Sequence, residues 1–410
     1  MKLLDNRVFR RLLLSFTYAC GVFLIVASGG SSGGGSGSSD DSCRLVISAI
    51  SPVTGTDDIW VGVLSELPSG EFNSVARLKR DGTEVFPPVP LESGFENVIR
   101  TVAVAEAGSN SKVYVGGDFS EGIFRLNADG SLDNAFVVGS GFNDSVSTIV
   151  PVGDGSGDIY VGGFFTEYDG TLVGGLVRLT DKGEMIVNYL GSQEILAVSK
   201  ALPTSLLYSG GSFAPTLARW DSFGIRDSSY KPSVKSDPVF SVAQVEYGSG
   251  AVYAGGDFSG GIYRFNIVGG GPDDTFDVGS GFNDSVRKIE LSEDSSGDLY
   301  AVGEFTTYQG DPANGLVRLK DDGSREISFS TGTGFSNADG LIPFGQFAAS
   351  ALAADASDDL YVGGDFTNYN GTAADGIVRL DDSGMLDPEF DAQIPAESGT
   401  CIDGTFVEDD

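Results

Sequence analysis

The sequence contains no histidine among its 410 residues. This absence excludes histidine-based catalytic triads, histidine general bases and most zinc or copper sites, because each of them needs an imidazole group. Any catalysis would have to use carboxylates, lysine, tyrosine or serine, and the sequence shows neither a nucleophile elbow nor a phosphate-binding glycine loop. We therefore expect a protein that is not an enzyme.

Basic residues are also scarce. The chain has 25 Lys and Arg against 58 Asp and Glu, which gives a formal net charge of -33. Nucleic acids and anionic lipid surfaces are bound through clusters of Lys and Arg, so this composition argues against both as partners. A membrane contact is expected only through the N-terminal segment, if that segment is not removed.

The clearest long apolar run covers residues 12–27 and follows the basic residues of positions 1–11. A positive stretch followed by an apolar one is the layout of a signal peptide, and it predicts export to the periplasm, the cell envelope or the outside. An uncleaved anchor is the alternative for residues 1–27. Residues 28–42 are almost all Gly, Ser and Asp and predict a flexible linker. Release in soluble form and attachment to the envelope both remain open.

Beyond the linker, the same short motifs return at intervals of roughly 45 to 60 residues. Each copy contains an apolar stretch with an aromatic residue that ends in glycine and phenylalanine. The aromatic positions are Trp60, Tyr114, Tyr160, Tyr208, Tyr253, Tyr300 and Tyr361. Each copy then carries an arginine before a bulky apolar residue, at Arg77, Arg125, Arg178, Arg219, Arg264, Arg318 and Arg379.

The runs inside each copy are four to eight residues long, rich in Val, Ile, Tyr, Phe and Thr, and separated by Asp-Gly, Ser-Gly and Asn-Gly turns. They indicate β-strands, since no helical periodicity is sustained. Repeats of this length with about four strands each are typical of propeller blades, which must stack on neighbours to bury their faces. The fold class is therefore predicted as all-β, a seven-bladed β-propeller over residues 43–402, with six or eight blades as alternatives and residues 403–410 as an acidic tail.

Three motifs resemble a known family. Tyr-Val-Gly-Gly-Asp-Phe-Thr-x-Tyr-x-Gly, Arg-Leu-x-x-Asp-Gly-x-Leu-Asp and Gly-Phe-Asn are similar to the delta-60 repeat of bacterial surface and secreted proteins, and the resemblance covers about residues 45–390. It implies a β-propeller and a bacterial secreted or surface location. It implies no catalytic residues, because the repeat family carries none in common.

The seven arginines are interpreted as a structural ring that anchors blade to blade. In the second copy, a two-residue turn at Ser120-Glu121 would set Arg125 opposite Gly116, with Asp118 as its diagonal partner. Glycine would then leave room for the guanidinium group. An anion site in the central channel is the alternative interpretation of the same arginines.

Two of the three cysteines, Cys43 and Cys401, flank the repeats. A closed ring brings its ends together, and an oxidising compartment favours a disulfide between a pair placed in this way. We therefore predict a Cys43–Cys401 disulfide, with two free thiols as the alternative.

Three turns read Asp-x-Ser-x-Asp, and oxygen ligands at alternate positions of a tight loop are one way in which proteins bind calcium. Asp and Ser are also ordinary turn formers, so a purely structural role is the alternative. The residues are Asp154, Ser156, Asp158, Asp294, Ser296, Asp298, Asp355, Ser357 and Asp359.

Three equivalent loops present Tyr168, Tyr308 and Tyr369, which would form a ligand-binding rim for a sugar or a protein if they are exposed. Tyrosines that fill their own loops are the alternative. The longest interruption of the repeats, about residues 324–346, is a further candidate for a partner surface.

These observations predict a non-catalytic exported scaffold that binds a protein or a carbohydrate at the bacterial envelope or outside it. The alternatives are a carbohydrate-active enzyme that uses channel carboxylates and a calcium-stabilised lectin. We expect no cofactor, with calcium as the one candidate. Whether two acids face each other at a distance suited to glycoside hydrolysis is a question for the structure.

Overall fold

Antiparallel β-strands form the regular structure of the described residues, in a computed structural model of the chain. The residues described are 44–67, 70–86, 88–90, 98–105, 111–191, 194–201, 206–212, 216–234, 237–245, 250–337, 349–355, 358–392, 394–396, 399–402 and 405–408. Among them, no helix has the length and apolar character that a membrane crossing needs. The predicted signal peptide and linker lie outside this part of the chain.

Seven sheets contain the seven repeats, and we number them in chain order. Sheet 1 consists of β1 (Arg44–Pro52), β2 (Ile59–Leu67), β3 (Gly70–Leu78) and β4 (Val89–Pro90). Sheet 2 consists of β5 (Ile99–Ala105), β6 (Lys112–Gly117) and β7 (Ile123–Asn127). Sheet 3 consists of β8 (Val146–Pro151), β9 (Ile159–Gly163), β12 (Leu176–Leu179) and β13 (Met185–Asn188). Sheet 4 consists of β14 (Ile195–Ala201), β15 (Leu206–Gly211) and β16 (Leu217–Trp220).

The later sheets follow the same order. Sheet 5 consists of β17 (Val239–Gln244), β18 (Val252–Gly256) and β19 (Ile262–Phe265). Sheet 6 consists of β20 (Val286–Leu291), β21 (Leu299–Gly303) and β24 (Leu316–Leu319), and sheet 7 of β26 (Ala351–Ala354), β27 (Leu360–Gly363) and β30 (Ile377–Leu380). The loops between the longer strands contain the short strands β10 (Glu167–Tyr168), β11 (Thr171–Leu172), β22 (Thr307–Tyr308), β23 (Asp311–Pro312), β25 (Phe335–Ser336), β28 (Asn368–Tyr369) and β29 (Thr372–Ala373). After the last repeat, β31 (Pro395–Ala396), β32 (Gly399–Ile402) and β33 (Thr405–Glu408) form a small separate sheet.

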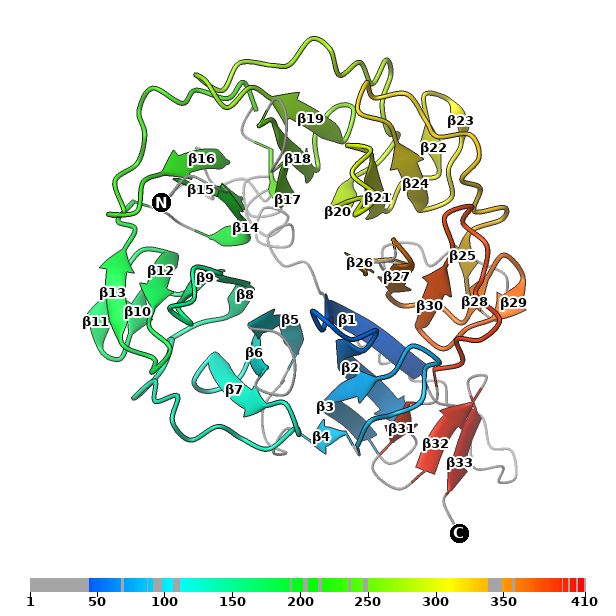
Figure 1. The fold of residues 1–410 in the computed structure, drawn as a ribbon, viewed down its shortest axis with the longest axis horizontal. Helices are drawn as coiled ribbons and strands as arrows, with labels where there is room; N and C mark the ends of the chain where they lie inside the picture. Colours follow the sequence, from blue (N-terminus) through cyan, green and yellow to red (C-terminus); the bar gives the residue numbers. More distant parts are fainter. Residues whose placement is uncertain are drawn as a thin grey trace, which may run out of the picture. The chain divides into compact units, whose positions relative to one another are not determined.

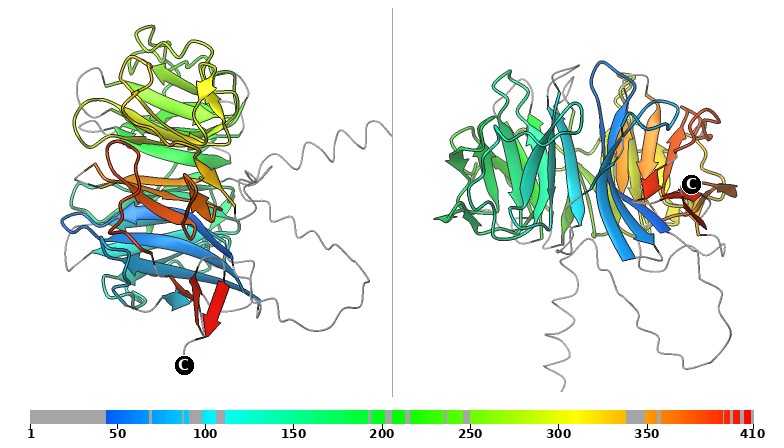
Figure 2. Two further views of the ribbon diagram at one scale, coloured as in Figure 1. Left: turned by 90° about the vertical axis from the view of Figure 1, so that its right-hand side faces the viewer. Right: turned by 90° about the horizontal axis from the view of Figure 1, so that it is seen from below.

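The sheets follow one another around a common centre in residues 41–410, with the first strand of each sheet innermost (Figure 1). Each first strand contacts the first strand of the next sheet, from β1 through β5, β8, β14, β17 and β20 to β26. Strand β26 in turn contacts β1. The side views in Figure 2 show the strands of neighbouring sheets stacked face to face.

The hydrophobic core lies between neighbouring sheets, because each sheet is too small to bury both of its faces alone. One buried cluster joins Tyr114 and Ile123 of sheet 2 to Ile159 and Val161 of sheet 3. Another joins Ile47 of sheet 1 to the last repeat through Tyr361 and Ile377. The end of the repeat array is thus packed against its beginning by the same kind of contact that joins successive repeats.

The first glycine of the Gly-Gly pair lets the next sheet come close. A Cβ atom built on Gly116 would lie 2.6 Å from Cγ1 of Val146, on the first strand of the following sheet. A Cβ atom on Gly363, in the last sheet, would lie 2.6 Å from Cγ2 of Ile47 in the first. Real Cβ atoms do not approach other carbons so closely, so a larger residue at either position would push the two sheets apart.

Sheet 6 has a valine, Val302, where the other sheets have this glycine. The following sheet compensates, because the register of β26 with β27 puts Ala349 at the place that Ile99 occupies in sheet 2. Val302 and Ala349 are both buried in one cluster. A large side chain on one sheet and a small one on the next therefore fill the same space as glycine and isoleucine do elsewhere.

The expected register of Arg125 is wrong. The chain does not turn tightly at Ser120-Glu121; it connects β6 to β7 through a longer loop, which Gly117 and Gly122 close with a backbone hydrogen bond of 3.1 Å. Arg125 consequently lies opposite Tyr114, and Gly116 lies opposite Ile123. The register differs from the predicted one by two residues, so Arg125 keeps its face of the sheet but changes its partner.

Candidate functional site

All seven arginines of the repeat lie directly across the strand pair from the aromatic residue of the repeat. The pairs are Trp60–Arg77, Tyr114–Arg125, Tyr160–Arg178, Tyr208–Arg219, Tyr253–Arg264, Tyr300–Arg318 and Tyr361–Arg379. In five of them the guanidinium carbon lies 5.3 to 5.8 Å from the centre of the tyrosine ring. Arginine stacks well on aromatic rings because its guanidinium group is planar and weakly hydrated.

Each arginine is also paired with an aspartate, and the aspartate comes from one of two turns. In sheets 1, 3 and 6 the turn between the first two strands supplies Asp58, Asp158 and Asp298. In sheets 2, 4 and 5 the outer turn after the arginine supplies Asp133, Asp227 and Asp273. Sheet 7 uses both turns, with Asp359 and Asp387 around Arg379. A desolvated guanidinium group is thus neutralised in every repeat.

Six of the arginines also reach the following sheet. Five donate a hydrogen bond to a backbone carbonyl of its outer turn: Arg77 to Ala128, Arg125 to Asp181, Arg219 to Ile267, Arg264 to Asp321 and Arg379 to Arg80. The sixth, Arg318, lies 3.4 Å from the Asp358 carboxylate. The bond from Arg379 to Arg80 runs from sheet 7 to sheet 1. These six arginines therefore join one sheet to the next, whereas the contacts of Arg178 lie within its own sheet. Asp118, the expected partner of Arg125, instead binds Arg100, with 2.6 Å between Nε and Oδ1.

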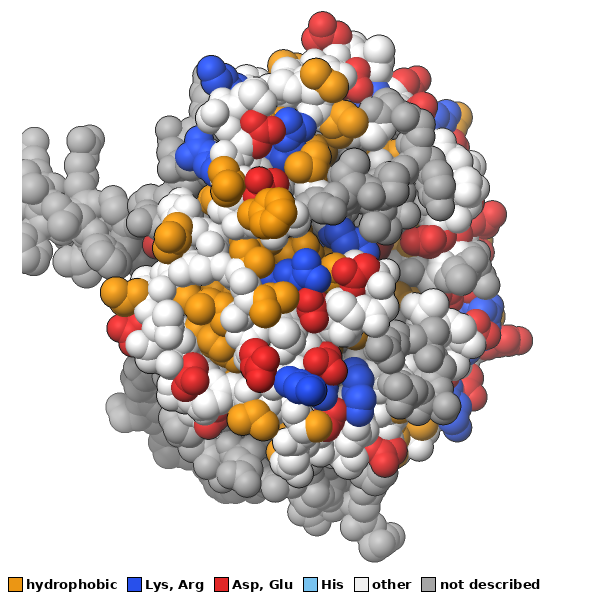
Figure 3. All heavy atoms as spheres, turned by 60° about the vertical axis from the view of Figure 1, so that its left-hand side comes forward, with side chains coloured by type: hydrophobic (Ala, Val, Ile, Leu, Met, Phe, Trp, Pro, Cys, Tyr) orange, Lys and Arg blue, Asp and Glu red, His pale blue; other side chains and the backbone are white. Residues whose placement is uncertain are grey.

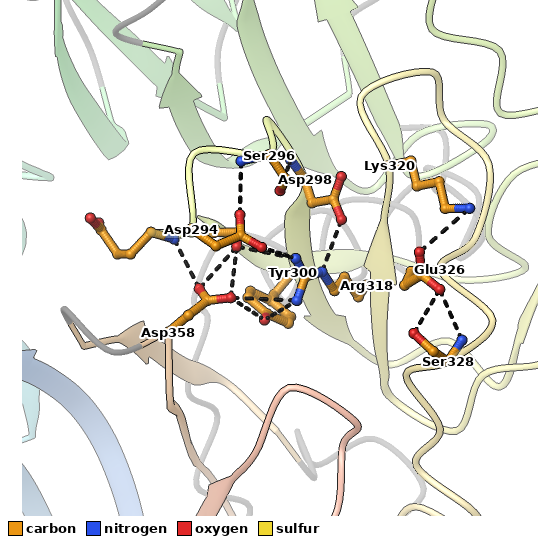
Figure 4. Close-up of polar contacts among 11 residues, drawn as sticks. Asp294, Ser296, Asp298, Tyr300, Arg318, Lys320, Glu326, Ser328 and Asp358 are labelled. Carbon is orange, nitrogen blue, oxygen red and sulfur yellow. Dashed lines mark hydrogen bonds and ion pairs between the residues drawn. The ribbon is translucent and has the colours of Figure 1, made fainter.

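The contacts of Arg318 are the most extensive (Figure 4). Its Nε donates to Asp298 at 3.0 Å, and its Nη1 donates to the Tyr300 hydroxyl at 3.0 Å. Asp358 enters from sheet 7 and accepts a hydrogen bond of 3.1 Å from the same hydroxyl. Burial raises the pKa of Tyr300 and that of Asp298. Burial also acts to raise the pKa of Asp294, but hydrogen bonds from Ser296, Ser292 and Arg318 hold it below its ordinary value.

The Asp-x-Ser-x-Asp turns are arranged around arginine. Arg178 binds Asp158 at 2.7 Å and lies 3.6 Å from Asp154, and Arg318 binds both Asp294 and Asp298. The serines close the turns, since Ser156 and Ser296 accept hydrogen bonds from the backbone N–H of the second aspartate. Asp359 binds Arg379, Asp355 accepts a bond from the Asp359 N–H, and Ser357 lies outside the described residues. Within those residues no group of three acids, cysteines or histidines is placed to hold a metal ion.

Of the two interpretations of the loop tyrosines, the exposed rim is wrong, and tyrosines that fill their own loops agree with the structure. Tyr168, Tyr308 and Tyr369 are buried, and each hydroxyl donates to the carbonyl of a glycine in its own sheet, Gly183, Gly323 or Gly384. Burial raises the pKa of all three tyrosines. These side chains fill their own loops and cannot stack on a ligand.

A phenylalanine from the preceding repeat covers each of these tyrosines. The ring centre of Phe142 lies 4.1 Å from that of Phe165 and 4.6 Å from that of Tyr168. The same three-ring contact occurs around Phe282 and around Phe335. The phenylalanine of this motif, which reads Gly-Phe-Asn at Phe142 and Phe282 and Gly-Phe-Ser at Phe335, therefore fastens one sheet to the next. The sequence alone did not reveal this role. The available signal was the 26-residue spacing that Phe142 and Tyr168 share with Phe282 and Tyr308, whereas Phe335 lies 34 residues before Tyr369.

Two further predictions lie wholly or partly outside the described residues. Residues 338–348 of the long interruption are not described, whereas Phe335, in its described part, is buried. Cys43 is not described, and the position of the Cys401 side chain is not described either. The disulfide stays a prediction.

A second set of ion pairs joins an arginine on the first strand of a sheet to an acid just after the second strand of the same or another sheet. Arg44 binds Asp365, from sheet 1 to sheet 7, while Arg100 binds Asp118 and Arg287 binds Glu304 within their own sheets. Glu290, on the innermost strand of sheet 6, is a separate acid. Burial, opposed by Lys288 and reinforced by Glu293, raises the pKa of Glu290 to about 7.

Comparisons with known proteins agree with an all-β propeller-like fold. The family model described as "Domain of unknown function (DUF5122) beta-propeller" matches residues 108–136, 295–329 and 357–390, in sheets 2, 6 and 7. No curated protein matches the chain in sequence. The WD40 beta propeller domain of Doa1 is similar in structure, with a TM-score of 0.53, 15% identity, and coverage of 82% of this chain and 92% of that one.

A second similar structure is Raptor from Chaetomium thermophilum, with a TM-score of 0.53 and 10% identity. The match covers 82% of this chain but only 28% of the Raptor chain. At such low identity the two structures bear on the fold alone. The predicted all-β, propeller-like architecture is confirmed.

Proposed function

We propose that residues 43–402 form a closed seven-bladed β-propeller of delta-60-type repeats that acts as a non-catalytic binding scaffold. In this proposal residues 1–27 direct export, and the protein works in the bacterial envelope or outside it. Its partner is a protein or a glycan. Closure is supported by the contact of β26 with β1 and by the bonds of Arg379 to Arg80 and of Arg44 to Asp365.

The observation that carries the scaffold function is the pairing of all seven repeat arginines with aspartates inside or between sheets. The charged and aromatic groups that recur in the sequence stabilise the stacking of the repeats. A rigid support built in this way leaves the surface free to vary, which is how propellers and other repeat folds present binding surfaces.

The rival function is a carbohydrate-active enzyme, for which two acids facing a solvent-filled cleft are needed. Incubation of the purified protein with a panel of polysaccharides, followed by measurement of released reducing ends, separates the two functions. We expect no release above the buffer control. Release that disappears on replacement of Glu290 by Gln would contradict the scaffold function and favour the enzyme.

Thermal unfolding of the same protein with calcium, with EGTA and with each polysaccharide tests the lectin alternative. A ligand that binds only the folded state raises the unfolding midpoint in proportion to RT ln(1 + [L]/Kd). We expect no calcium shift from the Asp-x-Ser-x-Asp turns, because arginine already occupies them. A clear shift with both calcium and a glycan would instead support the lectin.

A further inference from the structure

Exposed apolar side chains gather on the outer edge of sheets 3 and 4. They are Leu172 (73% exposed), Ile186 (50%), Leu190 (71%), Phe223 (80%) and Ile225 (65%), and we call these five residues the rim patch. Sheets 5, 6 and 7 expose a single large apolar residue each at their outer turns: Val268, Ile327 and Met385. Figure 3 shows the side of the molecule on which sheets 3 and 4 lie, with groups of hydrophobic side chains interspersed among acidic and basic ones.

The three segments that carry the rim patch touch one another. The turn of sheet 4 that carries Phe223 and Ile225 rests on β13, since a Cβ atom on Gly224 would lie 2.9 Å from the Asn188 carbonyl oxygen. Asn188 in turn donates a hydrogen bond of 3.2 Å to the carbonyl of Leu172. Asp221 fixes the turn, since its carboxylate accepts the backbone N–H groups of Phe223 and Ile225.

The patch is large for a surface that no partner covers. Side chains of this size with these exposed fractions present roughly 500 Å² of apolar surface, which is in the upper part of the range for the largest patch on a monomer, where patches are often functional. The edge strand itself is blunted: Ile186 is the unpaired extra residue of a bulge between Arg178 and Leu179 of β12. Recognition is therefore by side chains rather than by addition of a strand.

The charges around the patch select the kind of partner. The adjoining segments contain more acids than bases, with Glu167, Asp169, Asp181, Glu184 and Asp221 against Lys182 and Arg226. The net charge of the whole chain is -33. A cationic partner is attracted by the local and by the overall excess of acid, and electrostatic complementarity of this kind raises association rates and excludes like-charged proteins.

A second copy of the chain fits less well. Two rim patches would bury roughly 1,000 Å² in total, which is below the range of about 1,200–2,000 Å² for stable interfaces. Their acidic borders would also meet each other. A cationic protein gains further area by contacts with the acids outside the apolar centre.

We propose that the rim patch is the docking surface for a cationic protein partner that presents an apolar segment flanked by Lys or Arg. This inference rests on the scaffold function and names its partner class and its surface. It places binding on the outer edge of two adjacent sheets and not in the central channel.

The test uses the full chain and a synthetic peptide of alternating leucine and lysine, with a leucine–glutamate peptide as the charge-reversed probe. The variant is Ile186→Ser, Phe223→Ser and Ile225→Ser together. The matched control is Val268→Ser, Ile327→Ser and Met385→Ser, whose side chains are at least as exposed. Thermal unfolding establishes that both variants fold. A second variant, Glu184→Lys, changes the charge and leaves the apolar side chains in place.

We expect the leucine–lysine peptide to bind the wild type and the control equally, and the rim variant about tenfold or more weakly, as for the loss of central apolar anchors. Glu184→Lys should weaken binding, and salt should weaken it further. The proposal is overturned if the leucine–glutamate peptide binds as well, if rim and control variants behave alike, or if the wild type binds neither peptide. It is also overturned if sedimentation shows a dimer that only the rim variant dissociates.

Failure of this proposal is distinguishable from failure of the scaffold function. If the rim variant binds the peptide as well as the wild type does, the docking surface lies elsewhere and the scaffold function still stands. Release of reducing ends from a polysaccharide contradicts the scaffold whatever the peptides do.

Discussion

Arg379 shows why a charged side chain is accepted in the interior of this fold. It is only 1% exposed, lies against Tyr361 and is bound by Asp359 and Asp387. Removal of one member of a buried pair leaves the other charge desolvated, which costs about 3–5 kcal/mol. We expect Arg379→Met to lower the free energy of unfolding by about that amount in urea titrations. Arg226→Met, at an exposed position, is the control, and similar small losses in both variants would show that the pairing of Arg379 contributes little.

Two glutamates should make stability fall as the pH rises. Burial raises the pKa of Glu84 to about 7, and the pKa of Glu290 is also raised to about 7. In the unfolded chain a glutamate ionises near pH 4.3, so between roughly pH 4.5 and 7 the folded protein holds protons that the unfolded chain releases. The stabilisation from these protonated glutamates is fully present below about pH 4.5 and is lost as the pH rises to about 7. The double variant Glu84→Gln and Glu290→Gln should flatten the loss, measured by urea unfolding at several pH values. An unchanged slope would mean that neither glutamate is protonated in this range.

Much of each repeat could be predicted from the sequence because the signals are local. The alternation of apolar residues, the turn residues and the recurring arginine indicated the strands and a sheet-joining role for the arginines. The partner of Arg125 could not be predicted, because it depends on the length of the loop after Gly117 and on Asp133, beyond the strand. The tyrosine rim was a wrong prediction because Tyr168 is covered by Phe142, which belongs to the preceding repeat.

The fit between neighbouring sheets can be tested by exchanging one kind of packing for the other. A Cβ atom on Gly255 would lie 2.8 Å from Cγ1 of Val286, so Gly255→Val should destabilise the protein by about 1–3 kcal/mol through overpacking. Val286→Ala in the same chain should recover part of the loss, because the pair then resembles Val302 and Ala349. Denaturant unfolding of both single variants and of the double variant gives the coupling energy. Simple additivity would contradict the proposed exchange of volume.

At the scale of the whole molecule, closure of the ring predicts that overpacking the contact between the last and the first sheet destabilises the protein as much as overpacking any other contact between sheets. Gly363→Val would place a side chain against Ile47 across this contact, as Gly255→Val does in the middle of the chain. We expect similar losses of stability from the two substitutions, measured by denaturant unfolding. A nearly neutral Gly363→Val beside a destabilising Gly255→Val would indicate that the ring is open.

The direction of the contacts has a consequence for synthesis. Glycine at the second strand receives a side chain from the sheet that follows, and the arginine donates to the turn that follows, so each sheet is completed by residues translated after it. Folding of the emerging chain must therefore lag behind its production by one repeat. Only the last repeat packs against residues that are already synthesised, Ile47 and Arg80 of the first sheet. The first sheet gains these contacts when the last repeat has been made. During translation, the most recently completed repeat would therefore always lack its neighbour.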